Sequence, residues 1–153
     1  MLSDIAFKGC SPVLPNLRIT APDSPLRFYA LVDGDPDGLA ILSTYKYGSI
    51  AHAHESARLN APHLEWLGTR VSDVVSGIDS HGDDPLISLS WRDVKKARSM
   101  LANSPVLVED GPEPEWRAEL QTMLMLNVKF ETEILYGRDG GLEGWIDQKM
   151  MSM

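Results

Sequence analysis

Three carboxylates lie close together in residues 33–38, where the sequence reads Asp-Gly-Asp-Pro-Asp-Gly. Ionised side chains this close repel one another, and a bound hard cation offsets the repulsion. The spacing therefore predicts a metal site with Asp33 and Asp35 as ligands. The same residues also suit a turn, so the alternative is structural: Asp37 caps a following helix, while Asp33 and Asp35 lie solvated in the turn.

An EF-hand calcium loop is a second interpretation of this segment. Its acidic ligands at the first, third and fifth positions would correspond to Asp33, Asp35 and Asp37, with Gly38 at the sixth. The twelfth position should be a bidentate Glu, but Thr44 stands there, and the preceding residues resemble a strand rather than a helix. The EF-hand is therefore rejected.

A phosphotransfer site of the haloacid-dehalogenase type is the third interpretation. Asp33 would act as the nucleophile and Asp35 as the general acid, at the end of an apolar strand. Asp83 and Asp84 are candidates for the distal acidic pair, but they follow only about fifty residues later. The Thr or Ser and the Lys expected between the two acidic pairs are not evident. This phosphatase is kept as the enzyme alternative.

The elements around the acidic segment follow the order of an α/β domain. Phe28–Val32 is a continuous apolar run, typical of a strand buried on both faces of a parallel sheet. A helix is expected next, with Asp37 as its N-cap and Gly48 at its end. Its apolar residues recur three apart: Leu39, Leu42 and Tyr45. Further strands are expected at 64–68 and 85–90, so the order predicts βαβ connectivity.

The rest of the chain is expected to be mainly helical. Ser90 and Asp93 have the spacing of a capping box, which would begin a helix that runs to about residue 101. A loop over 103–114 follows, with 106–108 as a candidate short strand. We expect a long helix over 115–136, with an apolar stripe that includes Trp116. Gly137, Gly140 and Gly141 interrupt the pattern before a last short helix at 142–150.

Composition limits the classes of protein that remain. The length of 153 residues predicts one domain, expected over 28–153. Four prolines without a helical or strand period predict an irregular lead-in over 1–27. Its net charge of −8 disfavours binding to phosphate backbones unless a cation or a basic face intervenes. Cys10 is the only cysteine, which excludes an internal disulfide and a cysteine zinc cluster. No apolar run is long enough to predict a membrane partner.

Residues 28–49 resemble the metal-binding segment of a known family: an apolar strand, an Asp-x-Asp-Pro-x-Gly loop, then Thr-Tyr-Lys-Tyr-Gly-Ser. The segment is similar to the TOPRIM domain of the meiotic double-strand-break transesterases, which are the eukaryotic relatives of the DNA topoisomerase VI A subunit. The similarity continues in order through 64–68, 91–98, 119–124 and 129–134. It therefore covers most of the chain from Phe28 to Lys149.

The resemblance implies a fold, a cofactor and partners. It implies an α/β TOPRIM domain, Rossmann-like, with a short, mainly parallel sheet flanked by helices. It also implies Mg²⁺, or Mn²⁺, held by Asp33 and Asp35, and binding of double-stranded DNA by a homodimer. A further implied partner is a protein like the topoisomerase VI B subunit. The implied activity is that of a type IIB DNA topoisomerase-like enzyme, which cuts DNA by tyrosine transesterification in meiotic recombination, in the nucleus on chromosomes.

The chain departs from the family pattern at two points. A third ligand, a Glu upstream of the pair, is expected, but the first Glu is Glu55, and only Asp4 and Asp23 precede Asp33. The nucleophilic tyrosine belongs to a separate winged-helix domain, whereas the tyrosines here lie within or after the matched segment: Tyr29, Tyr45, Tyr47 and Tyr136. We therefore expect a truncated or divergent member with no catalytic residue of its own, inactive alone in strand cleavage. The competing interpretation is a non-catalytic remnant that acts as an interaction module.

Basic residues near the acidic loop are candidates for DNA contact. Lys46 follows the loop within one helix, so it is the predicted DNA-binding residue. Four further cations share the helix that begins after Ser90, where they either approach phosphate or form a solvated face: Arg92, Lys95, Lys96 and Arg98. The histidines are not expected to bind metal: His52 and His54 would diverge on a helix, and His63 and His81 are isolated.

Overall fold

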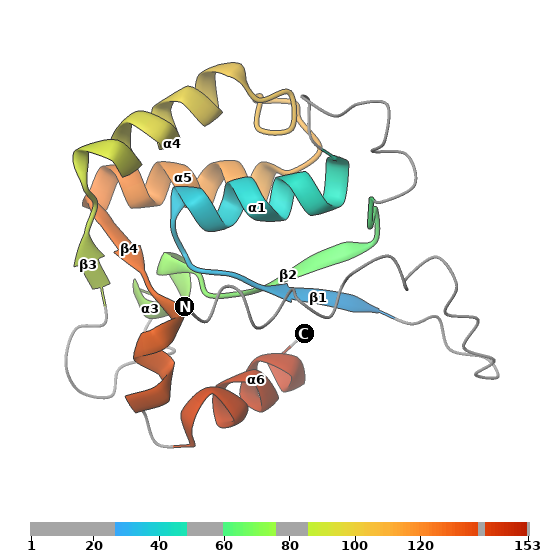
Figure 1. Ribbon diagram of the computed structural model, residues 1–153, viewed down its shortest axis with the longest axis vertical. Coiled ribbons are helices and arrows are strands. Elements are labelled where there is room, and N and C mark those ends of the chain that lie inside the picture. The colour runs from blue at the N-terminus through green and yellow to red at the C-terminus, as the bar shows by residue number, and fades with distance from the viewer. Residues whose placement is uncertain (1–26, 49–59, 76–85, 138–139, 153) are drawn as a thin grey trace, which may run out of the picture.

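The computed structural model describes residues 27–48, 60–75, 86–137 and 140–152 (Figure 1). The lead-in predicted for the first residues lies almost wholly outside this part of the chain. So do several residues singled out above: Asp4, Asp23, His52, His54, Glu55, His81, Asp83 and Asp84. Within the described ranges, no helix is both long and apolar enough to cross a membrane.

A parallel strand pair forms the centre of the molecule. β1 (Phe28–Leu31) pairs with β2 (Leu64–Gly68), with Phe28 opposite Leu64 and Leu31 opposite Gly68. α1 (Pro36–Tyr47) follows β1 directly and packs against β2. The two strands and the helix predicted from the apolar runs are therefore confirmed.

A second strand pair lies beside the loop that follows β1. β3 (Leu86–Ser88) pairs antiparallel with β4 (Val128–Phe130). An isolated bridge between Gly34 and Phe130 connects β4 to the loop after β1. The predicted α/β class, with a short parallel sheet flanked by helices, is confirmed, and the antiparallel pair is an addition to it.

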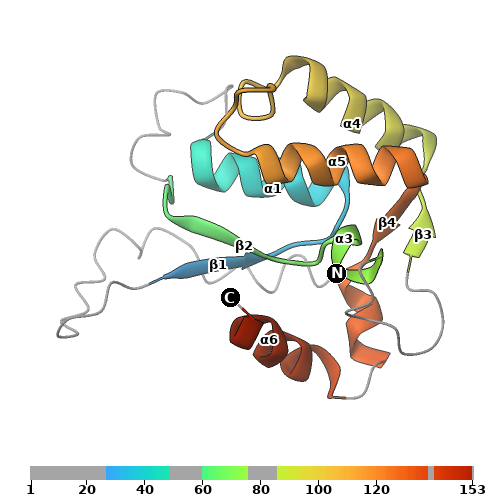
Figure 2. The ribbon, with the colours of Figure 1, turned by 180° about the vertical axis from the view of Figure 1, so that it is seen from behind.

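Helices cover both faces of the β1–β2 pair (Figures 1 and 2). α1 and α5 (Pro114–Leu126) lie on one face, and α4 (Trp91–Asn103) lies outside them. α6 (Gly141–Ser152) lies on the other face. The described ranges also contain two short helices: α3 (Val71–Val75) and the 3₁₀ helix η3 (Thr132–Gly137). α4 begins at Ser90 with the predicted capping box.

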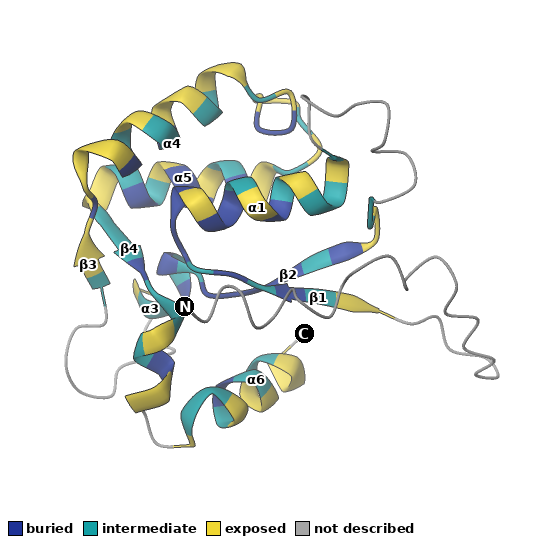
Figure 3. Ribbon diagram, viewed as in Figure 1, coloured by how far each residue is buried: buried dark blue, intermediate teal, exposed yellow. Residues whose placement is uncertain are grey.

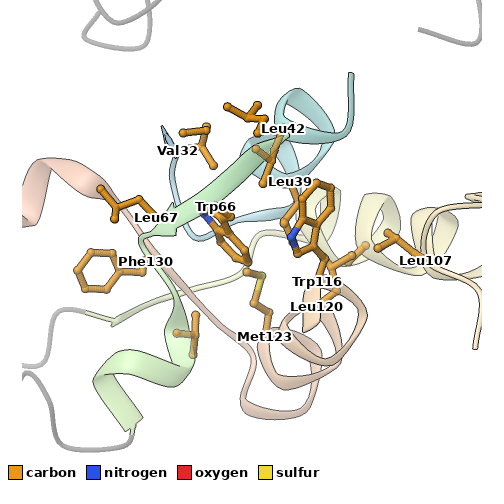
Figure 4. Close-up of a cluster of buried hydrophobic side chains, with 14 of the residues drawn as sticks. Val32, Leu39, Leu42, Trp66, Leu67, Leu107, Trp116, Leu120, Met123 and Phe130 are labelled. Atoms are coloured by element: carbon orange, nitrogen blue, oxygen red, sulfur yellow. The ribbon is translucent and has the colours of Figure 1, made fainter. Parts of the chain in front are cut away.

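The core fills the space between the β1–β2 pair and α1 and α5. Figure 4 shows side chains from α1, β2 and α5 pointing toward one another, and Figure 3 shows the buried residues on the inner sides of these elements. The buried apolar side chains include Leu39, Leu42, Trp66, Leu107, Trp116, Leu120, Met123 and Phe130. The helix and strand that carry the acidic loop are therefore anchored in the core.

The long helix predicted over 115–136 is wrong in its second half. α5 ends at Leu126, and Asn127 follows in the left-handed conformation with φ 55°. Val128–Phe130 then forms β4, because pairing with β3 and burial of Phe130 outweigh the helical spacing of the apolar residues. The candidate strand at 106–108 is a turn, in which Val106 and Leu107 are buried.

Candidate metal centre

The acidic loop is held against β4 by its backbone. The Gly34 N–H donates to the Phe130 carbonyl over 2.8 Å, and the Phe130 N–H donates to the Gly34 carbonyl over 3.0 Å. A Cβ atom on Gly34 would lie 2.5 Å from the Thr69 carbonyl oxygen. Only glycine fits this position without a shift of backbone, so the close approach fixes where the flanking aspartates lie.

Asp35, rather than Asp37, is the N-cap of α1. Its Oδ1 accepts a hydrogen bond from the Gly38 N–H over 2.7 Å, and its own backbone is extended. The prediction of Asp37 as N-cap is therefore wrong. Pro36 explains the difference, because a proline lacks an N–H and suits the first position of a helix, which places the cap one residue earlier. Asp37 lies instead in the first turn and pairs with Lys96 of α4.

Asp33 is oriented from the far end of the sequence. Its Oδ1 accepts a hydrogen bond from the Thr132 N–H over 2.9 Å, at the start of η3. Each of the two predicted ligands thus has one carboxylate oxygen fixed by a backbone N–H. Asp35 is 9% exposed, and Asp33 is half-buried. The structure brings both aspartates to the carboxyl end of β1, where open α/β sheets bind ligands.

The electrostatics of Asp35 favour a nearby cation. Burial raises the pKa of Asp35 above its ordinary value, and the negative charges of Asp33 and Asp37 act in the same direction. The Gly38 N–H and the Lys129 ammonium act against this rise without cancelling it. A carboxylate in this situation gains free energy from additional positive charge close by.

Lys129 lies beside the candidate site, although the sequence analysis did not single it out as a site residue. Its Nζ lies 3.2 Å from Glu131 Oε1, 3.8 Å from Asp93 Oδ2 and 3.9 Å from Asp35 Oδ2. Burial alone would lower the pKa of Lys129, but these three carboxylates raise it, so the side chain is charged. The apolar–polar–apolar order of Val128, Lys129 and Phe130 is compatible with a strand, but it gives no signal of the acidic neighbours of Lys129.

The donor set fits a hard divalent ion held in part by solvent or substrate. Mg²⁺ commonly binds through one or two carboxylates and keeps several waters, which leaves positions for phosphate oxygens. Asp33 and Asp35 supply such a pair. Within the described ranges, no three His, Cys, Asp or Glu residues are grouped so as to form a complete cage. The chemistry of the two aspartates therefore fits an open Mg²⁺ centre, and their role as its ligands stays a prediction.

Lys46 contacts Glu113 and Trp116 within the protein. Its Nζ lies 2.5 Å from Glu113 Oε1 and 5.3 Å from the centre of the Trp116 ring, and its side chain is 18% exposed. The Tyr47 hydroxyl donates a hydrogen bond to the same Glu113 oxygen over 2.5 Å. The pKa of Tyr47 is raised, mainly by burial and further by the hydrogen bond and charge of Glu113. The role of Lys46 in DNA binding stays a prediction, and the structure gives this side chain a packing role at the end of α1.

The other predicted candidates in the described ranges lie on several different elements. Arg92, Lys95 and Arg98 are exposed on α4, and His63 is exposed before β2. The tyrosines within the described part are distributed over β1, α1 and η3: Tyr29, Tyr45, Tyr47 and Tyr136.

The comparisons with known proteins agree with this geometry. Residues 17–143 match the family described as the Toprim domain of Spo11 and of the topoisomerase 6 A subunit. The chain is 40% identical over 119 residues to the meiotic recombination protein SPO11-1 of Arabidopsis thaliana, a match that covers 78% of this chain and 32% of that protein. It is 36% identical over 107 residues to the meiotic recombination protein SPO11 of Homo sapiens. This match covers 70% of the present chain and 26% of the human protein. It is 35% identical over 121 residues to the A3 subunit of DNA topoisomerase 6 of Oryza sativa subsp. indica. This match covers 78% of the present chain and 26% of the rice protein. The chain therefore spans about a third or less of the length of these relatives.

Proposed function

The chain belongs to the Toprim family of Spo11 and the topoisomerase 6 A subunit, and from this we propose that it is the magnesium-binding module of a protein that makes DNA double-strand breaks in meiotic recombination. The relatives named above are meiotic recombination proteins and one component of a topoisomerase. The family assignment leaves the haloacid-dehalogenase alternative at Asp33 without support.

Asp33 and Asp35 hold the Mg²⁺ in this proposal. When bound, the ion supplies positive charge beside a DNA phosphate and locally reverses the sign of an acidic surface. The chain's own groups prepare the site: the Thr132 and Gly38 N–H groups orient the two carboxylates. Lys129 balances the charge of Asp35 from the opposite side.

Cleavage needs a group from outside these residues. We propose that a tyrosine hydroxyl from a winged-helix domain attacks a DNA phosphodiester. The new bond joins the tyrosine oxygen to phosphorus as a 5′-phosphotyrosyl link, and the departing oxygen leaves as a 3′-hydroxyl. Two protomers cut the two strands in the nucleus, together with a partner like the topoisomerase VI B subunit. The chain alone binds DNA and does not cut it.

One observation carries the metal proposal: both carboxylates leave the end of β1, and each has one oxygen fixed by a backbone N–H. Residues at i and i+2 along an extended backbone point to the same side, which supports the proposal that the two side chains share one ion. The negative charges of Asp33 and Asp37 beside the buried Asp35 support the proposal, because a bound cation would offset their repulsion.

Titration of Mn²⁺ followed by electron paramagnetic resonance tests this assignment without any assay of cleavage. The Asp33→Asn and Asp35→Asn variants should each weaken binding at least tenfold, because each removes a charged ligand. Asp147→Asn, an exposed acid on α6, is the matched control and should leave binding unchanged. Equal binding by parent and both site variants would favour the interaction-module alternative instead.

A further inference from the structure

Most Lys and Arg side chains of the described part contact acidic or carbonyl groups within the protein. These ranges contain ten Lys and Arg residues. Six of them pair with acidic side chains: Arg27, Lys46, Arg70, Lys96, Lys129 and Lys149. Arg117 donates to the Leu107 carbonyl over 2.6 Å. The structure gives no acidic partner within the described ranges to the remaining three, and all three lie on α4: Arg92, Lys95 and Arg98.

These three cations share the outward side of α4. Trp91, Lys95 and Arg98 recur at helical spacing along one stripe, and Arg92 flanks it. The opposite side carries the buried Asp93 and Ala97 and packs toward α1 and α5. Figure 3 shows the outer surface of α4 as mainly exposed. The stripe is about 10 Å long at the helical rise of 1.5 Å per residue.

An aromatic side chain accompanies the charges. Trp91 is 71% exposed, and the Arg92 guanidinium lies 5.8 Å from the centre of its ring. The capping box formed by Ser90 and Asp93 fixes the start of the helix and so holds this end of the stripe in place. An exposed ring beside unpaired cations suits a partner that offers both phosphates and the flat faces of sugars or bases.

The stripe begins beside the candidate metal centre. Asp93, in the first turn of α4, lies 3.8 Å from Lys129, and Lys129 lies 3.9 Å from Asp35. One turn further along, Lys96 pairs with Asp37 of the acidic loop. The inner edge of α4 is therefore joined to the acidic loop, and the three cations lie on the solvent-exposed side of the same helix.

We propose that the outer face of α4, made of Trp91, Arg92, Lys95 and Arg98, binds the backbone of duplex DNA that reaches the metal centre. This inference rests on the proposed function, because it takes DNA as the partner. In a chain of net charge −8, three neighbouring cations with no acidic partner among the described residues are the charge complement of a polyanion. The metal ion and α4 then contact successive phosphates of one DNA segment.

The test measures fluorescence anisotropy of a short labelled duplex over a range of salt, with Mn²⁺ present. The triple variant Arg92→Gln, Lys95→Gln, Arg98→Gln should lower the salt slope of log K by about 2 to 3, because each phosphate contact contributes ~0.9. The matched control is Gln148→Glu, Met151→Glu, Ser152→Glu on α6, which reaches the same net charge and lies on the opposite side of the molecule (Figure 1). The salt slope of this control should differ from that of the parent by no more than ~0.9, which is the contribution of one phosphate contact.

The outcomes separate this inference from the proposed function. An unchanged slope in the α4 variant, with DNA binding still dependent on Asp33 and Asp35, would overturn the α4 assignment alone. Absence of DNA binding by the parent chain would overturn both. Tighter binding of poly-glutamate than of duplex DNA to α4 would identify an acidic protein segment as the partner and also overturn the proposal. The Arg92→Lys, Arg98→Lys variant keeps the charges and should keep the parent slope.

Discussion

The Thr132 N–H donates a hydrogen bond to Asp33 Oδ1 over 2.9 Å, although 99 positions separate the two residues. Two further backbone hydrogen bonds, between Gly34 and Phe130, hold the same region together. The orientation of the first predicted ligand therefore depends on a segment from the last quarter of the chain. Each of the following predictions perturbs one part of this arrangement.

Replacing Gly34 by alanine should destabilise the fold. The added Cβ would lie 2.5 Å from the Thr69 carbonyl oxygen and 3.1 Å from Phe130 Cβ, so backbone must move. We expect the free energy of unfolding, measured with urea, to fall by about 1–3 kcal/mol. Gly144→Ala is the matched control: it lies inside α6 with open space around it, and should raise stability by about 0.5–1 kcal/mol. Equal effects of the two variants would contradict this account of the loop.

Two substitutions at Asp35 should separate its structural role from its charge. Asparagine is as good an N-cap as aspartate, so Asp35→Asn should stay within a few tenths of a kcal/mol of the parent in urea unfolding. Asp35→Ala loses the bond to the Gly38 N–H and should cost about 0.5–2 kcal/mol. Both variants should lose Mn²⁺ affinity. Strong Mn²⁺ binding by the folded Asp35→Asn protein would show that the Asp35 carboxylate is not a metal ligand.

Replacing Lys129 by methionine should leave three carboxylates without their shared cation. Since Lys129 is mostly buried between Asp35, Asp93 and Glu131, the expected loss in the free energy of unfolding is about 1–3 kcal/mol. Added Mn²⁺ should recover part of this loss, which thermal unfolding with and without the metal would measure. Lys95→Met removes an exposed cation of α4 and should change stability by less than about 0.5 kcal/mol. A loss of the same size in both variants would contradict the proposed role of Lys129.

Asp93 should contribute to the loss of stability in acid. Burial acts to raise its pKa, but the hydrogen bonds with Ser90 and the charges of Lys129 and Lys96 outweigh burial and lower the pKa below the ordinary 3.8. The unfolded chain then binds more protons near this pH, so the stabilisation is present above about pH 4 and is lost as the pH falls through the lowered pKa. Urea unfolding at several pH values should show a shallower acid decline for Asp93→Asn than for the parent. An unchanged decline would contradict this assignment, and Asp110→Asn, an exposed loop acid, serves as the control.

Local sequence patterns are sufficient to predict the elements that they define. The apolar runs of β1 and β2, the helix after the acidic loop and the capping box of α4 each depend on residues within a few positions of one another. The same patterns place Asp33 and Asp35 correctly at the end of β1, although their binding of a metal stays a prediction. Local pattern is enough for these elements because the clear apolar runs of the sequence lie within them.

The remaining errors come mainly from contacts between distant segments. The apolar spacing of β4 fits both a helix and a strand, and only pairing with β3 decides between them. Lys129 escapes a sequence-based search for the same reason, since its acidic partners come from the N-cap of α1, from α4 and from the residue after β4. The wrong choice of Asp37 as N-cap has a local cause, because Pro36 already determines the first helical position.

The bridge between Gly34 and Phe130 also affects how related gene products are interpreted. During translation the acidic motif leaves the ribosome long before the strand that will hold it has been made. A shortened transcript that stops before Val128 would encode the whole motif and yet no β4. An intact reading frame through Thr132 is therefore the better criterion for a splice variant that retains the site.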